Sequence, residues 1–352
     1  MKILKLSKKN LDLFVSVLPA FGEVYAPVRR GNGFVFDQPS KWSDVQMNYP
    51  RTILPPKKFL LPPREATFTF HPEKGYRDLL AEASKPIVLF GVHSYDIYGL
   101  NILDRVFAQS RYPDPYYIAR RKNTAIIGVD FEPDEKHVAS SMNADFVDSG
   151  FDLFLSDIGE DYLVLVGTSR GDDMVVMSNC LMTPPTQADF SEYKKRSKMR
   201  RASYKAHVDL EGLPEILEME YHSAVWDEMG ERCLSCGSCS MVCPTCYCFD
   251  VNDEVDLGSR SGRRIRSWDS CLLRTHALVA GGENFRAARS SRVKFRYYHK
   301  QRGFVAEYGR PSCVGCGRCV EACPAQINII SVIEAIRGER NGITNNAAAA
   351  AS

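Results

Sequence analysis

The cysteines of this chain are the residues whose spacing points most directly to chemistry. Twelve are present in 352 residues, and all except Cys180 lie between Cys233 and Cys323. Eight of them form two copies of the pattern C-x2-C-x2-C-x3-C-P, one ending at Pro244 and the other at Pro324. This pattern is typical of proteins that bind two [4Fe–4S] clusters, in which the fourth cysteine of each copy ligates the cluster of the other copy.

The repeat therefore predicts two clusters with crossed ligand sets. The first set is Cys233, Cys236, Cys239 and Cys323, and the second set is Cys313, Cys316, Cys319 and Cys243. Glycines at 237, 315 and 317 would let the backbone pass close to the sulfur atoms, where its N–H groups can donate hydrogen bonds. Structural zinc sites use pairs of cysteines and four ligands in all, so a third cysteine followed by C-P argues against zinc.

Three more cysteines, Cys246, Cys248 and Cys271, lie between the two motifs. Three thiolates make an incomplete cluster site, so a third iron–sulfur site would need a fourth ligand such as Asp269 or His276, or would leave one iron open. The alternatives are buried structural thiols or a redox disulfide. Cys180 is expected to be a small core residue.

A basic segment follows these cysteines at residues 286–302, RAARSSRVKFRYYHKQR, and it contains seven Lys or Arg and no acid. Basic and aromatic residues together can bind single-stranded nucleic acid. We favour a role in the cluster environment or in partner docking, because the segment lies between two cysteine motifs whose thiolates are negative. A solvated helix face is the remaining alternative.

Two regions are expected to position these side chains, and together they predict an α+β fold class. Residues 1–212 read as a mixed α/β scaffold or docking domain, with strands at 86–92 and 124–130 and a hairpin at 151–167. Residues 213–340 read as an α-helical ferredoxin domain with two cubane clusters, in which segments such as 270–282 would be helical. Residues 341–352 include the run NNAAAAAS and read as a disordered or artefactual tail.

Composition narrows the function classes. The chain is 44% hydrophobic and 25% charged with a formal charge of +2, so no global field points to nucleic acid or to a membrane surface. No secretory leader and no run of about 20 apolar residues is present, so we expect a cytoplasmic protein in which dense cysteines bind metal. No G-x-G-x-x-G, P-loop or H-E-x-x-H motif indicates a nucleotide or catalytic zinc site.

Several segments resemble one known family, the beta subunit of cytosolic NiFe sulfhydrogenases and the related A subunit of anaerobic sulfite reductase. The matching segments are RCLSCGSCSMVCPTCYCFDV, RSWDSCLLRTHALVAGGENFR, CVGCGRCVEACPAQIN, YPRTILPPKKFLLPPRE and FGVHSYDIYGLNILD. The resemblance covers nearly the whole chain. It implies an iron–sulfur subunit that relays electrons between a flavin- and NAD(P)(H)-binding subunit and a terminal catalytic subunit.

The chain departs from this family in its amino-terminal half. There the family carries cysteines, which could hold an extra cluster, at the positions of Tyr95, Phe131, His137 and Ala139. Tyr, Phe and Ala cannot replace thiolates as cubane ligands. We therefore expect that the amino-terminal domain has lost this cluster, whereas Cys246, Cys248 and Cys271 match cysteines that the family retains.

These observations lead to one principal hypothesis and one alternative. The principal hypothesis is an electron-transfer subunit of a soluble multi-subunit oxidoreductase, not catalytic alone, whose terminal partner is a hydrogenase, a sulfite reductase or a heterodisulfide-reductase-like subunit. The alternative is a catalytic sulfur or disulfide reductase that uses a cluster with an open iron at Cys246, Cys248 and Cys271. Neither nucleic acid nor a membrane is expected as a partner.

Overall fold

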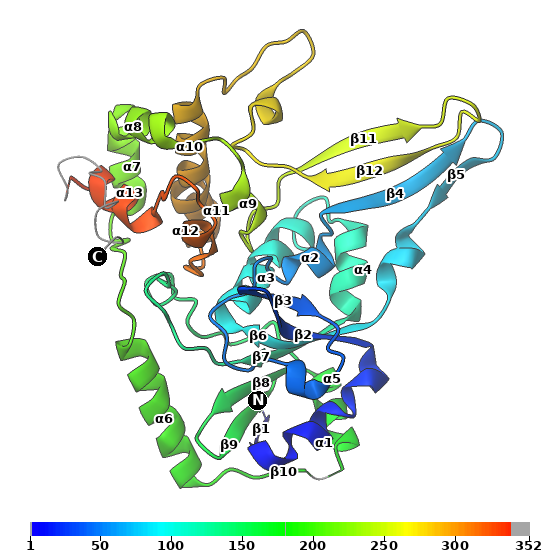
Figure 1. The fold of residues 1–352 in the computed structure, drawn as a ribbon, viewed down its shortest axis with the longest axis vertical. Helices are drawn as coiled ribbons and strands as arrows, with labels where there is room; N and C mark the ends of the chain where they lie inside the picture. Colours follow the sequence, from blue (N-terminus) through cyan, green and yellow to red (C-terminus); the bar gives the residue numbers. More distant parts are fainter. Residues whose placement is uncertain (1, 180, 339–352) are drawn as a thin grey trace.

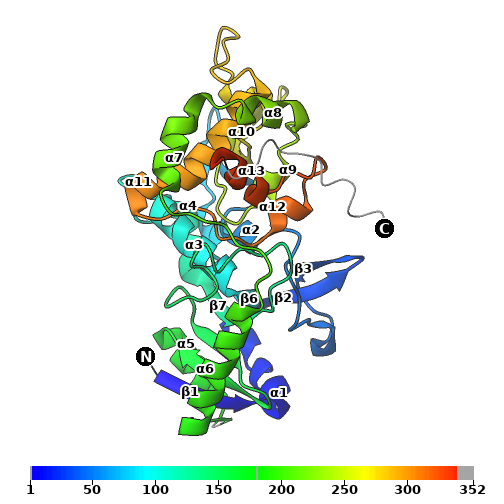
Figure 2. The ribbon, with the colours of Figure 1, turned by 90° about the vertical axis from the view of Figure 1, so that its left-hand side faces the viewer.

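The structure is a computed structural model that describes residues 2–179 and 181–338. A mixed eight-stranded sheet lies at one end of the molecule and a group of short helices at the other, while a four-stranded sheet extends to the side (Figures 1 and 2). The predicted fold class, a mixed α/β part followed by a helical ferredoxin part, is confirmed. Cys180 and the predicted tail at 341–352 lie outside the described residues.

The eight-stranded sheet has the strand order β10-β1-β9-β8-β7-β6-β2-β3. Strands β2, β6, β7 and β8 are parallel neighbours, and antiparallel strands complete both edges. The strands are β1 (Lys2–Ser7), β2 (Glu23–Arg30), β3 (Gly33–Asp37), β6 (Ile87–His93), β7 (Thr124–Val129), β8 (Leu153–Asp157), β9 (Asp161–Val166) and β10 (Met182–Thr183). The strands expected at 86–92 and 124–130 and the hairpin at 151–167 are therefore present.

Both faces of this sheet are covered. Val88 and Phe90 of β6 pack in one apolar cluster with Phe14, whereas Leu89 packs in another with Leu100. Alternate residues of a strand point to opposite faces, which explains why β6 reads as a continuous apolar run. The flanking helices are α1 (Leu11–Val15), α2 (Lys57–Leu60), α3 (Ser94–Phe107), α4 (Pro115–Asn123), α5 (Ser169–Met177) and α6 (Gln187–Ala202).

The four-stranded sheet joins two segments that are distant in sequence. Its order is β11-β12-β4-β5, and its strands are β4 (Arg64–His71), β5 (Gly75–Asp78), β11 (Phe249–Val255) and β12 (Gly262–Trp268). Strand β12 lies between the two cysteine motifs and pairs with β4 of the amino-terminal half. This sheet thus attaches the insert between the motifs to the α/β part (Figure 1).

The prediction of a helix at residues 270–282 is wrong. The segment forms only one short 3-10 turn, Arg274–Ala277. Its first residues instead bond locally, because Asp269 Oδ1 accepts from the Ser270 N–H and Ser270 Oγ accepts from the Leu272 N–H. Such side-chain bonds to the backbone compete with a helix.

Short helices surround the two cysteine motifs. They are α7 (Leu213–Met219), α8 (Val225–Arg232), α9 (Ser238–Met241), α10 (Arg289–Tyr298), α11 (Phe304–Tyr308), α12 (Arg318–Glu321) and α13 (Ile329–Ile336). Helix α8 packs against α10 through Trp226, whose ring lies 5.9 Å from that of Tyr297 between centroids. A single π-helical turn, His299–Gly303, continues α10 toward α11.

One hydrophobic core extends across both parts of the molecule. Tyr95, Phe131 and Val138 of the α/β part belong to the same buried cluster as Trp226 and Ile333. The region that contains the cysteine motifs therefore packs directly against the α/β part through a shared core. The proposed boundary between residues 212 and 213 stays a prediction.

Candidate metal centre

The two cysteine motifs have the same local backbone structure. Gly237 and Gly317 occupy the left-handed region, with φ of 76° and 73°, directly before the short helices α9 and α12. Ser235 and Gly315 take positive φ at the matching earlier position. The internal repeat in sequence is therefore an internal repeat in conformation, and each fourth cysteine comes just after its short helix.

The first cavity is lined by the first predicted ligand set, Cys233, Cys236, Cys239 and Cys323. Three of these side chains come from the first motif, and the fourth comes from the end of the second. Cys236 is the exposed member of the set, whereas Cys233 is buried. The neighbouring Leu234 is 61% exposed, so this cavity lies close to the molecular surface.

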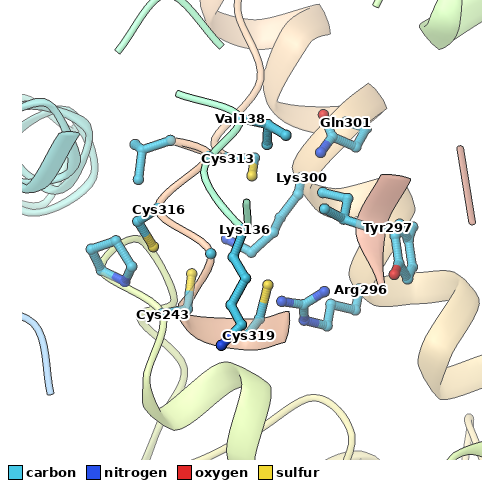
Figure 3. Close-up of a pocket in the computed structure, with 15 residues that line it drawn as sticks. Lys136, Val138, Cys243, Arg296, Tyr297, Lys300, Gln301, Cys313, Cys316 and Cys319 are labelled. Carbon is cyan, nitrogen blue, oxygen red and sulfur yellow. The ribbon is translucent and has the colours of Figure 1, made fainter. Parts of the chain in front are cut away.

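The second cavity is lined by the other predicted set, Cys313, Cys316, Cys319 and Cys243 (Figure 3). Burial raises the pKa of the Cys316 and Cys319 thiols to about 11. A cluster would therefore have to displace thiol protons as it binds. The structure brings together each crossed set of four cysteines, and their role as ligands stays a prediction.

Hydrogen-bond donors lie next to several of these sulfur atoms. The Ser235 N–H donates to Cys233 Sγ at 3.4 Å, and the Ile327 N–H donates to Cys323 Sγ at 3.3 Å. The Ser238 hydroxyl also lies 3.3 Å from Cys236 Sγ, whereas the Thr245 hydroxyl, 3.4 Å from Cys243 Sγ, donates its hydrogen to Ser312 O. Donors in these places suit thiolates that carry negative charge when they bind iron.

The second motif is pressed against the backbone of residues 136–139. The Val138 N–H donates to Gly315 O at 2.9 Å. A Cβ at Gly315 would lie 2.4 Å from the Val138 carbonyl carbon, and one at Gly317 would lie 2.8 Å from Lys136 O. Gly315 and Gly317 are therefore needed where the two backbones approach closely, in addition to the predicted approach of the backbone to the sulfur atoms.

Arg296, Tyr297, Cys319 and Ile329 line both cavities and form their common wall. Arg296 and Lys300 belong to the basic segment at 286–302, and both are buried. The cluster-environment interpretation thus agrees with the position of these two side chains. Individual buried cations were not identified from the sequence, although the spacing of four between Arg292, Arg296 and Lys300 is a visible helical signal.

The remaining three cysteines divide between two places, with Cys248 and Cys271 together as one group and Cys246 beside Cys243 of the second ligand set. Cys248 and Cys271 lie within hydrogen-bonding distance, and the Cys271 thiol lowers the pKa of Cys248. Cys246 lies in the same way against Cys243, whose pKa it lowers. Asp269 forms an ion pair with His276, and both act electrostatically on Cys248. Both candidates for a fourth ligand therefore lie beside this group, and a third cluster stays a prediction.

Tyr95, Phe131 and His137, the positions at which the resemblance predicted family cysteines, lie close together as packed rings. The Tyr95 and Phe131 rings are 4.8 Å apart between centroids, and the Phe131 and His137 rings are 5.1 Å apart. Ala139 is fully buried in the same core as Tyr95 and Phe131. Cys316 of the second set also acts electrostatically on Tyr95 and raises its pKa, although burial is the larger cause.

The donor sets fit iron–sulfur clusters better than single metal ions. Among residues 2–179 and 181–338, no group of three or more His, Cys, Asp or Glu side chains is arranged to hold one metal ion. Each cavity is lined by the four cysteines of one predicted set, with Cys319 lining the first cavity as well, and a cubane spreads its four ligands around a larger group. The described helices include none long and apolar enough to cross a membrane.

The fold and the two four-cysteine cavities define an iron–sulfur protein of the dicluster ferredoxin class, and residues 232–327 match the family model described as a 4Fe-4S dicluster domain. The chain is also 40% identical to sulfhydrogenase 2 subunit beta of Pyrococcus furiosus over 96% of this chain and 99% of that protein. The protein belongs to the family of sulfhydrogenase beta subunits, which confirms the resemblance.

Two further relatives match only in part. NADH-quinone oxidoreductase subunit 9 of Rhodothermus marinus is 36% identical over 20% of this chain and 34% of that protein. F420-dependent formate dehydrogenase subunit beta of Methanocaldococcus jannaschii is 27% identical over 32% of this chain and 22% of that protein. The chain is thus an iron–sulfur subunit of an oxidoreductase.

Proposed function

We propose that this chain relays electrons between a flavin- and NAD(P)(H)-binding subunit and a terminal catalytic subunit. A [4Fe–4S] cluster would supply reversible one-electron chemistry in each cavity. Cys233, Cys236, Cys239 and Cys323 would hold the first cluster, and Cys313, Cys316, Cys319 and Cys243 the second. The protein's own contribution is to bury the sulfur atoms, to donate hydrogen bonds to them and to fix the distance between the two centres.

The observation that carries this proposal is the common wall of the two cavities. Cys319 and Arg296 line both, so the two ligand sets are adjacent. The first cavity also approaches the surface at Cys236, while the second is enclosed by Cys316 and the α/β part. Adjacent centres with one near the surface are what a relay between subunits needs.

The similarity to subunits of redox enzymes supports the proposed partner subunits. The first relative is a subunit of a sulfhydrogenase, and the two partial matches are subunits of an NADH-quinone oxidoreductase and an F420-dependent formate dehydrogenase. All three names describe subunits of redox enzymes. We therefore propose a flavin-containing partner at one end and a hydrogenase, sulfite reductase or heterodisulfide-reductase-like subunit at the other.

A third cluster at Cys246, Cys248 and Cys271 is part of the proposal. The Cys248 and Cys271 thiols lie against each other, Cys246 acts electrostatically on Cys271, and Asp269 and His276 lie beside Cys248. Lys57 donates from its buried Nζ to Cys246 O at 2.6 Å, which adds a positive charge next to the group. If one iron there were open, the same site would support the alternative function, direct reduction of a sulfur or disulfide substrate.

We also propose that the amino-terminal domain acts as scaffold and docking surface without a cluster. The rings of Tyr95, Phe131 and His137 occupy the place where the family carries cysteines. This leaves the cysteine-rich region as the electron path through the subunit.

Anaerobic purification of the natural complex tests the proposed function. We expect a flavoprotein and a second catalytic subunit to co-purify with this chain, and NAD(P)H to reduce its clusters only when the flavoprotein is present. The isolated chain, reduced with dithionite, should not turn over polysulfide or a disulfide. Turnover by the isolated chain would contradict the relay and support the catalytic alternative.

A further inference from the structure

Helix α10 and the turn after it carry three buried cations on one side. Arg292, Arg296 and Lys300 are four residues apart, and they are 4%, 7% and 3% exposed. Residues at this spacing share one face of a helix. Arg292 bonds to the carbonyl oxygens of Leu272 and Ala287, which explains its burial as a structural clamp.

Arg296 has a different environment. It lines both cysteine cavities, and Figure 3 shows its guanidinium beside Cys319. Its Nη2 donates a long hydrogen bond of 3.5 Å to Cys239 O, and its buried Nε has no partner among the described residues. Burial would lower the pKa of Arg296, but the sulfurs of Cys239 and Cys319 outweigh this and raise it.

Lys300 reaches the second cavity. Its Nζ donates to Thr245 Oγ1 at 2.8 Å, and that hydroxyl lies 3.4 Å from Cys243 Sγ. Figure 3 shows the Lys300 side chain extending from its helix toward the space around which the four sulfur atoms lie. Lys300 lines the second cavity and is absent from the lining of the first.

These two cations lack the counter-charge that two other buried arginines, Arg318 and Arg51, have. Arg318 is paired with Asp96, and Arg51 is paired with Asp134. Within the described residues no carboxylate pairs with Arg296 or Lys300. A buried charge is costly without a partner of opposite sign, and the groups of opposite sign near Arg296 and Lys300 are the cysteine sulfurs.

We propose that Arg296 and Lys300 set the reduction potentials of the two clusters, Arg296 acting on both and Lys300 on the second. This inference rests on the proposed function, because it requires both clusters. A [4Fe–4S]2+ core takes up one electron, so the anionic cluster and its four thiolates become more negative on reduction. A fixed cation at close range stabilises the reduced state more than the oxidised state and therefore raises the potential.

Redox titration followed by EPR spectroscopy, on the full chain with its clusters, tests this assignment. Arg296→Gln should shift both midpoint potentials to more negative values, whereas Lys300→Gln should shift the potential of the second cluster alone. Arg296→Lys keeps the charge and should restore most of the lost potential. Arg302→Gln is the matched control, because Arg302 lies on the same stretch but is 42% exposed and paired with Glu218.

Each outcome decides the question. The inference would be overturned if Arg296→Gln and Lys300→Gln retained both clusters and left their midpoint potentials unchanged. Shifts no larger than those in Arg302→Gln would overturn it in the same way. If Arg296→Gln does not retain iron, two other variants still test the inference. Arg296→Lys should preserve the midpoint potential of the second cluster, and Lys300→Gln should lower it. Absence of two cluster signals in the unmodified chain would overturn the proposed function instead.

Discussion

Arg318 lies inside the second cysteine motif and forms a fully buried two-point ion pair with Asp96 of helix α3. Its Nη1 and Nη2 donate to the two carboxylate oxygens at 2.6 Å and 2.7 Å, and its Nε donates to Thr52 O at 2.7 Å. The pair therefore fastens the motif that supplies Cys316 and Cys319 to the α/β part of the molecule.

Removal of one member of this pair should weaken that attachment. We expect Asp96→Asn to lower the free energy of unfolding by about 3–5 kcal/mol, because it leaves the Arg318 charge buried without a counter-ion. Denaturant unfolding measures this change. Arg30→Gln is the control, since its ion pair with Asp37 is exposed and should cost less than about 1 kcal/mol. Equal effects in the two variants would contradict the structural role of the buried pair.

Gly315→Ala should disrupt the second cavity. Its Cβ would lie 2.4 Å from the Val138 carbonyl carbon, and its φ of 64° is unfavourable for alanine. Gly309→Ala separates the two effects, because Gly309 has a φ of 69° and open space around its Cβ. We expect Gly309→Ala to cost about 1–2 kcal/mol and to keep its iron. Gly315→Ala should cost more and lose iron from the second cluster, and equal iron content in the two variants would contradict this.

Iron analysis tests the third site. With three cubanes the chain would contain about twelve irons, and Cys248→Ser should reduce this to about eight. Asp269→Asn and His276→Gln then identify the fourth ligand, because the variant that removes it should lower the same iron content. A chain with about eight irons both before and after Cys248→Ser would contradict a third cluster.

Substitutions of Phe131 test whether the amino-terminal domain lacks a cluster. Phe131→Ala should lower the free energy of unfolding by about 3–5 kcal/mol, because it removes a buried ring that contacts Tyr95 and His137. Iron content should stay unchanged, since no cluster is expected there. Phe131→Leu is the milder companion variant. Loss of about four irons in Phe131→Leu would show that a cluster occupies this region.

The parts of the molecule that depend on local patterns could be predicted from the sequence. The cysteine repeat predicted which side chains would meet in each cavity, and continuous apolar runs predicted strands β6 and β7. The pairing of β4 with β12 could not be predicted, because Arg64 and Ser267 are far apart in the chain and local sequence does not encode such a partner.

The buried cations were hidden for another reason. The sequence favoured a role in the cluster environment or in partner docking for residues 286–302, but it did not show which of the seven cations are buried, because such residues are seldom buried without a partner. Arg296 and Lys300 lie inside beside cysteines that raise the pKa of both cations, and composition does not reveal this proximity. The helix expected at 270–282 failed because Asp269 and Ser270 bond to the backbone that a helix would use.

The crossed assignment of the two clusters is the central claim, and EPR spectra of four single variants test it most directly. Cys236→Ala and Cys323→Ala should alter the same cluster signal, although the two residues belong to different motifs. Cys316→Ala and Cys243→Ala should alter the other signal. If Cys323→Ala instead matched Cys316→Ala, each motif would hold its own cluster, and the arrangement described for the two cavities would be contradicted.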